Sequence, residues 1–288
     1  MTDTQSHAAS QPSWLKGRSI DDWRVQFDRD GYIIFEDVLS AQEIAALRSA
    51  LAPRLDQNIT GRNDFEGLKS NRIYALLAKS PLFADLAIHE AVLPFAEADL
   101  GPGYLLSACL AINLHPSETA QPWHFDDSHY QWPRPRPSLG VSVFWPLDDM
   151  TEENGATEII PGSHLWGDDM VVGAVDQNSF DDKQMRDVDD DPGARPDAMK
   201  VIMSAGSVMM AKGTLWHRGG ANKSGAERLI VTPQYCAGWA RQLENMVLAV
   251  PPEIAKQLPK RAQELIGYSI QPPFMGYVDG VHPKRTIE

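Results

Sequence analysis

A histidine and an aspartate stand two residues apart in the segment QPWHFDD, at His124 and Asp126. In an extended segment, side chains at positions i and i+2 point to the same side, so these two can bind one cation together. A third ligand must come from elsewhere, and His217, in a glycine-rich turn between two predicted strands, is the best candidate. Two histidines and one carboxylate on one face of a metal leave positions open for an oxidant and a co-substrate. That facial triad is diagnostic of non-haem iron(II) oxygenases.

Arg228 follows His217 by eleven residues and lies on the next predicted strand. A dicarboxylate bound to the metal needs its far carboxylate neutralised, and arginine does this through a bidentate fork. Taken singly, each residue also has an ordinary structural explanation, such as a loop hydrogen bond, a turn position or a surface salt bridge. The same three ligands could hold zinc with an open position for water, so a metal-dependent hydrolase stays an alternative, as does a non-catalytic binding protein.

Four segments, taken in order, resemble the phytanoyl-CoA dioxygenase family of iron(II)/2-oxoglutarate oxygenases. They are RDGYIIFEDVLSAQEIAALR, QPWHFDD, ENGATEIIPGSH and HRGGANKSGAER. The resemblance runs from about Asp21 to Tyr235, which is most of the chain. It implies a mainly β fold with flanking helices, in which a double-stranded β-helix (jelly-roll) core is wrapped by the helices.

The resemblance also implies a ligand for each of the residues singled out above. His124, Asp126 and His217 would bind Fe(II), Arg228 would bind the distal carboxylate of 2-oxoglutarate, and O2 would take the last open position. The expected reaction is hydroxylation, desaturation or rearrangement at an unactivated C–H bond of a lipophilic small molecule, coupled to conversion of 2-oxoglutarate to succinate. Halogenases of this broad class lack the carboxylate that Asp126 supplies, so its presence argues for oxygen insertion, desaturation or another oxidative rearrangement. The likeness is closest to members that tailor small molecules in secondary metabolism.

Other residues near these motifs are candidates for ligand contact. Thr157, in the turn NGAT, and Gln121, just before the first ligand, resemble positions that contact 2-oxoglutarate, and Asn113 on the preceding strand could face the same molecule. The candidates for substrate contact are His129, Tyr130, Trp145 and Trp216. Turn hydrogen bonds, an exposed loop and buried core positions are the structural alternatives for these residues.

Short apolar runs separated by Gly, Pro, Asn and Asp indicate a β-rich core over residues 101–240. The strands expected there are 104–114, 139–147, 156–161, 200–203, 207–211 and 228–236. An Asp-rich, aromatic-poor stretch at 167–197 interrupts them and is expected to be an inserted surface loop or lid.

Helices are expected on both sides of this core, within a single domain that spans residues 20–288. The part from 20 to 100 is predicted to be helical, with one short buried strand at 32–35. The tail, 241–288, is expected to hold one amphipathic helix and irregular structure. Residues 1–19 are polar and small, which predicts a disordered lead-in.

The chain has 26 basic and 39 acidic residues, a net charge of −13. This balance argues against nucleic acid and anionic membranes as partners, and against a CoA ester, whose phosphates would need a basic patch. No secretory signal or membrane-spanning apolar run is visible, and two cysteines make no disulfide framework, so a cytoplasmic location is expected. The expected partner is a small-molecule substrate, and a homodimer is an open alternative to a monomer.

Overall fold

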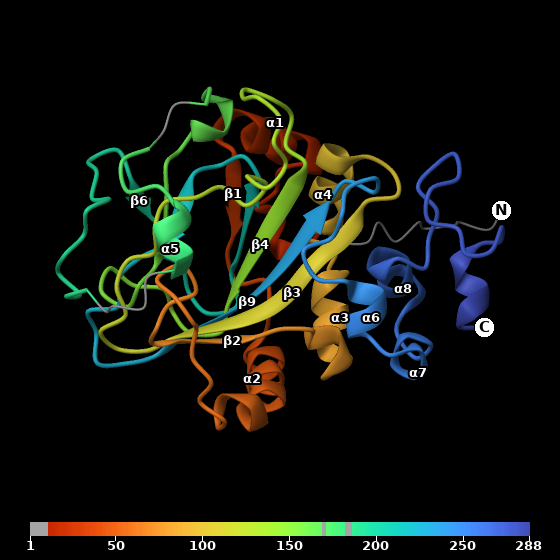
Figure 1. The fold of residues 1–288 in the computed structure, drawn as a ribbon, viewed down its shortest axis with the longest axis horizontal. Coiled ribbons are helices and arrows are strands. Elements are labelled where there is room, and N and C mark those ends of the chain that lie inside the picture. The colour runs from red at the N-terminus through yellow and green to blue at the C-terminus, as the bar shows by residue number, and fades with distance from the viewer. Residues whose placement is uncertain (1–10, 169–170, 182–185) are drawn as a thin grey trace, which may run out of the picture.

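Two antiparallel sheets face each other in the computed structural model, which describes residues 11–168, 171–181 and 186–288 (Figure 1). The larger sheet has the strand order β1-β7-β4-β9-β3-β2, and the smaller has the order β6-β5-β8. The larger consists of β1 (Tyr32–Phe35), β2 (Ser70–Ile73), β3 (Leu105–Leu114), β4 (Gly140–Pro146), β7 (Val208–Lys212) and β9 (Arg228–Cys236). The smaller consists of β5 (Thr157–Ile159), β6 (Met199–Lys200) and β8 (His217–Gly219). The predicted jelly-roll class is confirmed.

The strands of the larger sheet separate two cores because successive side chains point to opposite faces. On β9, Leu229 and Val231 join the main core beneath the helices, whereas Ile230 joins a second core between the two sheets. Phe144 of β4 and Ile159 of β5 meet in that second core. Inner-face positions of β3, β4 and β9 are therefore the ones that can reach a site between the sheets.

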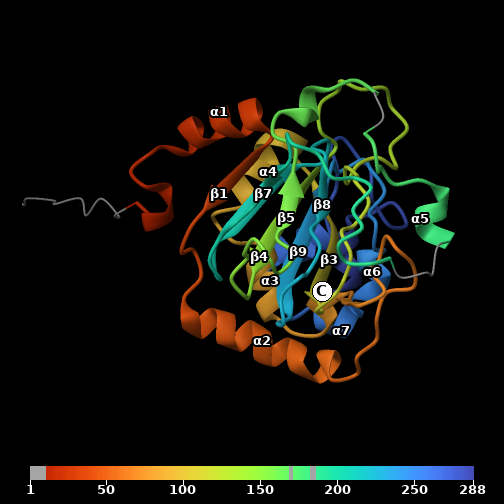
Figure 2. The ribbon, with the colours of Figure 1, turned by 90° about the vertical axis from the view of Figure 1, so that its left-hand side faces the viewer.

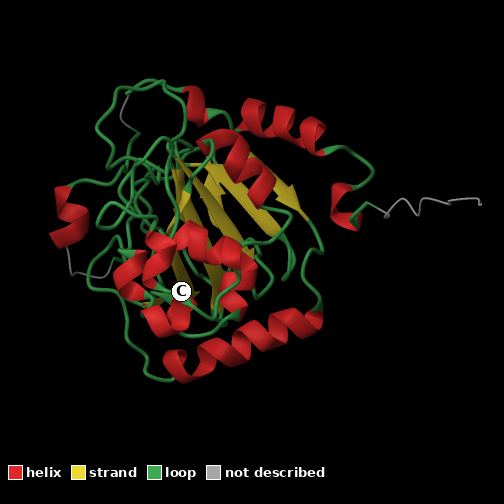
Figure 3. Ribbon diagram, turned by 90° about the vertical axis from the view of Figure 1, so that its right-hand side faces the viewer, coloured by secondary structure: helices red, strands yellow, loops and turns green. Residues whose placement is uncertain are grey.

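Helices pack on the outer face of the larger sheet, as Figure 3 shows, and Figure 2 shows the smaller sheet on the opposite side. They are α1 (Ile20–Asp30), α2 (Ala41–Leu55), α3 (Leu82–Ala87), α4 (Leu93–Leu100), α6 (Met246–Ala249), α7 (Pro252–Ala255) and α8 (Lys260–Ile266). Phe83 of α3, Phe95 of α4 and Leu265 of α8 are all fully buried in the main core with Val231 of β9. Ser40 and Glu43 form the capping box that opens α2. No described helix is long and apolar enough to cross a membrane.

Three expectations for the flanking regions were wrong. Residues 70–73 form strand β2 rather than helix, because they pair with β3 along its free edge. The tail holds three short helices, α6, α7 and α8, rather than one, and Pro259 separates α7 from α8. A disordered lead-in was predicted for residues 1–19. Residues 1–10 lie outside the described residues, and for residues 11–19 the prediction of disorder fails. There Trp14 is buried, with its ring 4.8 Å from that of Phe35.

Candidate active site

The backbone brings the two candidate histidine ligands directly opposite each other. His124 and His217 exchange both main-chain hydrogen bonds, with N–O distances of 3.0 and 2.8 Å. This antiparallel pairing places their imidazole rings 4.4 Å apart, centroid to centroid. Asp126 lies two residues beyond His124 and points to the same side, as the extended conformation requires. Residues more than 90 positions apart in the sequence are thus joined by one local strand pairing.

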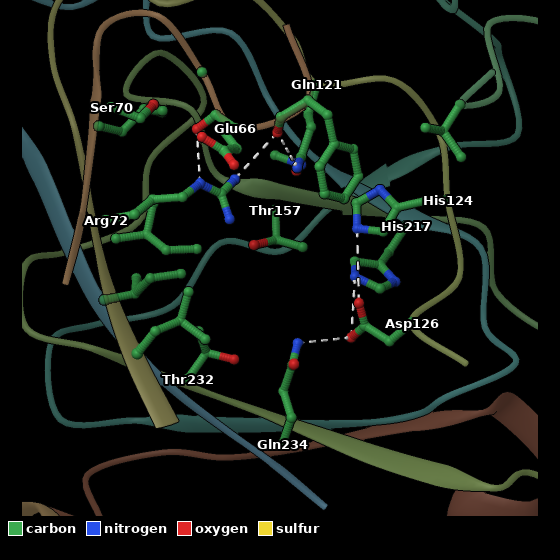
Figure 4. A pocket seen from close by; sticks show the side chains of 18 of the residues that line it. Glu66, Ser70, Arg72, Gln121, His124, Asp126, Thr157, His217, Thr232 and Gln234 are labelled. Carbon is green, nitrogen blue, oxygen red and sulfur yellow. Dashed lines mark hydrogen bonds and ion pairs between the residues drawn. The ribbon is translucent and has the colours of Figure 1, made fainter. Parts of the chain in front are cut away.

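The three side chains converge on one point (Figure 4). Their ligand atoms lie within 4.8 Å of one another, with Asp126 Oδ1 at 3.8 Å from His124 Nε2 and Oδ2 at 3.6 Å from His217 Nε2. The Nδ1 atom of each histidine lies 3.0 Å from a backbone carbonyl, that of Pro122 or Leu215. A carbonyl only accepts, so each Nδ1 keeps its hydrogen and each Nε2 turns a lone pair toward the cluster.

Burial and neighbouring groups together favour the protonation states that a metal requires of His124 and Asp126. Desolvation, together with neighbouring His217, lowers the pKa of His124 to about 4, so its imidazole is neutral at neutral pH. Burial alone would raise the pKa of Asp126, but the two histidines and the Ser142 hydroxyl lower it below its usual value. Neutral imidazole and ionised carboxylate are the forms that ligate a cation, and this donor set fits Fe(II).

The cluster opens into a cavity of about 410 Å³ between the two sheets. This volume lies within the range of small-molecule binding sites. One wall is apolar and is formed by Ala108, Leu110, Ile112, Phe144, Ile230 and Leu243. The polar side chains that face the cavity besides the three ligands include Arg72, Gln121, His129, Thr157, Arg228, Thr232 and Gln234.

Arg228 lies in this cavity as a buried cation, 2% exposed. Its Nη2 donates to the Gly155 carbonyl, while Nε and Nη1 have no hydrogen-bond partner among the described residues. Burial lowers its pKa to about 10, so the guanidinium is still charged at neutral pH. A buried charge without a partner is costly, and two free N–H groups on a guanidinium match a carboxylate. The site therefore fits the distal carboxylate of 2-oxoglutarate.

Three further predicted residues also line the cavity: Gln121, His129 and Thr157. The Gln121 amide is already engaged, since Nε2 donates to the Phe65 carbonyl and Oε1 accepts from Gly219 N. Its side chain thus ties the segment that carries His124 to Phe65 and Gly219. Contact of these residues with 2-oxoglutarate or substrate stays a prediction.

Four predicted contact residues do not line the cavity. For Asn113 and Trp145 the prediction was wrong, and for Trp216 and Tyr130 it stays a prediction. Asn113 faces the other side of β3 and donates to Asn71 and Glu227, because the positions of β3 that line the cavity are 108, 110, 112 and 114. Trp145 is an outer-face residue of β4, fully buried in the main core. Trp216 packs on Phe125, with ring centroids 4.9 Å apart. The Tyr130 hydroxyl donates to the Arg241 carbonyl at the surface.

Sequence reasoning missed Arg72, a second arginine in the cavity. Its Nε and Nη2 donate to the carbonyls of Glu66 and Phe65 at 2.7 and 3.1 Å, and Figure 4 shows the third nitrogen turned into the cavity. A helical interpretation of this region concealed it, whereas a strand at 70–73 would have placed Arg72 on one face. Ser142, Thr232 and Gln234 were also missed. Their signal was a polar residue at alternate positions of otherwise apolar strands.

The insertion at 167–197 supplies part of the cavity wall. Phe180, in α5 (Gln177–Asp181), has its ring 5.2 Å from that of Phe65, which in turn lies 5.0 Å from His124. Phe65 N donates to the Ser179 carbonyl, so the two segments are joined by backbone as well. The insertion therefore contributes Val175 and Phe180 to the cavity wall, beside the Phe65 ring that packs on His124.

A buried cluster of two histidines and one carboxylate, held between the sheets of a jelly roll, defines the class of non-haem iron oxygenases. The phytanoyl-CoA dioxygenase (PhyH) family matches residues 27–230, and the chain belongs to this family. It is a non-haem iron dioxygenase that uses Fe(II) and 2-oxoglutarate, as the sequence predicted. The zinc hydrolase and the non-catalytic binding protein are correspondingly disfavoured.

Relatives with assigned activities are similar over most of the chain. The multifunctional dioxygenase prhA of Penicillium brasilianum is 24% identical, covering 87% of this chain and 83% of its own. The dioxygenase FUM3 of Gibberella moniliformis is 27% identical, covering 86% and 82%.

Solved structures share the fold. EctD from S. alaskensis, with 2-oxoglutarate and 5-hydroxyectoine, has a TM-score of 0.57 at 23% identity and covers 75% of each chain. HygX from Streptomyces hygroscopicus, with nickel and 2-oxoglutarate, has a TM-score of 0.59 at 18% identity, covering 81% of this chain and 90% of its own.

Proposed function

We propose that His124, Asp126 and His217 are the iron ligands of this dioxygenase and that Arg228 anchors the distal carboxylate of 2-oxoglutarate. The observation that carries the proposal is that the three ligand atoms share one cavity with a buried arginine, Arg228, that forms no salt bridge with a described carboxylate. Iron and 2-oxoglutarate, when bound with O2, supply the oxidant that attacks a C–H bond. The chain supplies binding, orientation and exclusion of water.

The cavity residues divide this work. The Arg228 fork fixes one end of the dicarboxylate, and Thr157, on the neighbouring sheet, offers a hydroxyl in the same space. The two imidazoles are held by the backbone carbonyls that accept from Nδ1, so they need no rearrangement to receive a metal. Phe65 packs its ring on His124, so it would shield that side of the metal cluster from water, and Phe180 packs against Phe65.

We further propose that the substrate is a lipophilic small molecule of secondary metabolism. The apolar wall on β3 and β9 supports a hydrocarbon surface on the substrate. A CoA ester is disfavoured, because Asp64, Glu66, Glu118 and Glu244 line the same cavity and would repel phosphates. A structural neighbour, SnoK, is described as a carbocyclase from nogalamycin biosynthesis, which is consistent with small-molecule tailoring.

The insertion at 167–197 is proposed to act as a wall or lid of the substrate cavity. A cytoplasmic location is proposed as well, since Cys109 and Cys236 are both buried and free, as a reducing compartment permits. A homodimer remains a proposal that size measurement in solution would test.

Replacement of Asp126 by Ala tests the metal assignment. The variant should lose most formation of succinate from 2-oxoglutarate in the presence of Fe(II) and O2, measured without added substrate. The melting temperature without metal reports whether the variant is folded. Undiminished succinate formation by folded Asp126→Ala protein would overturn the assignment.

Thermal stability separates the oxygenase from a zinc hydrolase. Ligands that bind only the native state raise the melting temperature, by about 2.7 kcal/mol of stabilisation at a hundredfold excess over Kd. Fe(II) with 2-oxoglutarate should produce a larger rise than Fe(II) alone. The absence of any rise from saturating 2-oxoglutarate would favour the hydrolase.

A further inference from the structure

The Asp126 carboxylate receives two hydrogen bonds at one of its oxygens. The Ser142 hydroxyl donates to Oδ2, and the Gln234 amide Nε2 donates to the same atom at 3.3 Å. Oδ1 accepts no hydrogen bond from any described residue. Figure 4 shows the Gln234 amide reaching toward Asp126 from below the cavity.

The two donors converge because of strand register. Ser142 on β4 and Gln234 on β9 are directly opposite partners in the antiparallel ladder. Opposite residues have Cβ atoms about 4.5–5.5 Å apart on the same face, so both side chains can meet one acceptor. Their strand neighbours Val141 and Tyr235 point to the helix-covered face and belong to the main core. Two rigid central strands therefore hold the carboxylate, rather than a loop.

The position of the carboxylate alone does not fix how it would bind a metal. Both of its oxygens lie within 4 Å of an imidazole Nε2, Oδ1 near His124 and Oδ2 near His217. A carboxylate that turned both oxygens to the iron would occupy a coordination position that O2 or 2-oxoglutarate needs. Hydrogen bonds that engage one oxygen bias the group toward binding through the other.

We propose that Ser142 and Gln234 are positioning residues that hold Oδ2, so that Asp126 binds iron through Oδ1 alone and three positions stay open. This inference rests on the proposed assignment of Asp126 as an iron ligand. Their effect on the iron is transmitted through the Asp126 carboxylate, to which both donate.

Fe(II) titration of the 288-residue protein under anaerobic conditions tests the proposal. Ser142→Ala removes one donor and should weaken Fe(II) binding about 10–100-fold, as loss of such outer partners does elsewhere. Gln234→Met keeps the approximate length of the side chain and removes the longer hydrogen bond, so a smaller loss of affinity is expected. The matched control is Ser207→Ala, another buried serine, whose hydroxyl meets only that of Ser204. It should bind Fe(II) like the wild type.

The absorption band of the Fe(II)–2-oxoglutarate complex provides a readout that general destabilisation does not move. The band should shift in Ser142→Ala and shift further in the double variant, because the released Oδ2 changes the coordination of the iron. Normal Fe(II) affinity and an unshifted band in both single variants would overturn the positioning role. Failure of the wild type to bind Fe(II) would overturn the ligand assignment itself, and the positioning role with it. If Ser142→Ala does not fold, Gln234→Met tests the same oxygen from the other strand.

Discussion

Two buried arginines stand ten residues apart in one glycine-rich segment, and the structure treats them in opposite ways. Arg218 is fully paired, with Nη2 at 2.7 Å from Glu158 and 2.6 Å from Asp191. Burial alone would lower its pKa, but these carboxylates raise the pKa above the ordinary value. Arg228 has no carboxylate within salt-bridge distance among the described residues, and burial lowers its pKa to about 10.

The difference distinguishes an arginine whose partners lie within the fold from one that we propose binds 2-oxoglutarate. Arg218 joins β5 to the insertion, because Glu158 lies on β5 and Asp191 within 167–197. Arg228 lines the cavity, and its Nε and Nη1 have no hydrogen-bond partner among the described residues. Both residues are buried arginines, so the presence or absence of carboxylate partners is what distinguishes the two. The experiments below test that distinction.

Replacement of Arg218 by Leu should produce the largest loss of stability. It leaves Glu158 buried and Asp191 partly buried without a counter-charge, and breaking a buried ion pair from one side typically costs about 3–5 kcal/mol. Urea unfolding of the metal-free protein measures the free energy of unfolding. If the free energy of unfolding of Arg218→Leu equals that of the wild type within error, the Arg218 ion pairs contribute little to stability. The structural role assigned to Arg218 would then be wrong.

Replacement of Arg228 by Leu should leave stability unchanged or raised, and should instead impair 2-oxoglutarate binding. Loss of one partner from a buried charge pair costs about 2–5 kcal/mol, which corresponds to roughly thirtyfold or more in Kd. Arg228→Lys retains the charge without the planar fork and should bind with intermediate affinity. Titration of the Fe(II)-loaded protein with 2-oxoglutarate provides the Kd. An unchanged Kd in Arg228→Leu would assign the distal carboxylate to another group, of which Arg72 is the candidate.

The contrast between the arginines also shows how far sequence reasoning reaches. His124, Asp126, His217 and Arg228 could be singled out because their residue types and spacing carry chemical meaning. They form an extended His-x-Asp pair, a histidine in a glycine-rich turn and an arginine on the next predicted strand. The errors at Trp145 and Asn113 arose because a strand prediction does not say which of its two faces is the inner one. Once the register of β3, β4 and β9 is known, the alternation of side chains between the two faces of the sheet assigns Trp145 and Asn113 to the outer face.

Other site residues depend on contacts that no local pattern encodes. Arg72 enters the cavity because an edge strand, β2, pairs with β3, and the sequence there resembles a helix. Phe180 reaches the metal side only through the docking of the insertion, which Arg218 and Asp191 help to hold. Long-range pairing of this kind is decided by the whole fold, so neither residue could be predicted from its neighbours.

Thr232 is an uncharged counterpart of Arg228, because it is also a buried polar group without a partner among the described residues. Its hydroxyl is buried in the cavity wall and has no hydrogen-bond partner among the described residues. Thr232→Val should therefore leave the ligand-free protein equally stable, or more stable by up to about 1 kcal/mol. Ser163→Ala is the contrasting variant, since the Ser163 hydroxyl accepts from Trp216 N, and its removal should cost about 1–3 kcal/mol. A clear loss of stability in Thr232→Val would mean that its hydroxyl is satisfied before any ligand arrives.

The smallest expected effect is a pH dependence of the free energy of unfolding. It arises from Asp191, the carboxylate partner of Arg218, and Arg228 has no such partner among the described residues. Burial opposes ionisation of Asp191, but its hydrogen bonds and attraction to Arg218 hold its pKa below 3.8. A carboxylate with a lowered native pKa stabilises the fold above its unfolded pKa, and that stability is lost as pH falls through the native value. Wild type should therefore exceed Asp191→Asn in free energy of unfolding at neutral pH, and the gap should close below pH 3.8. Urea unfolding of both proteins across this range measures the gap. A gap that persists unchanged in acid would show that Asp191 acts through packing rather than through its charge.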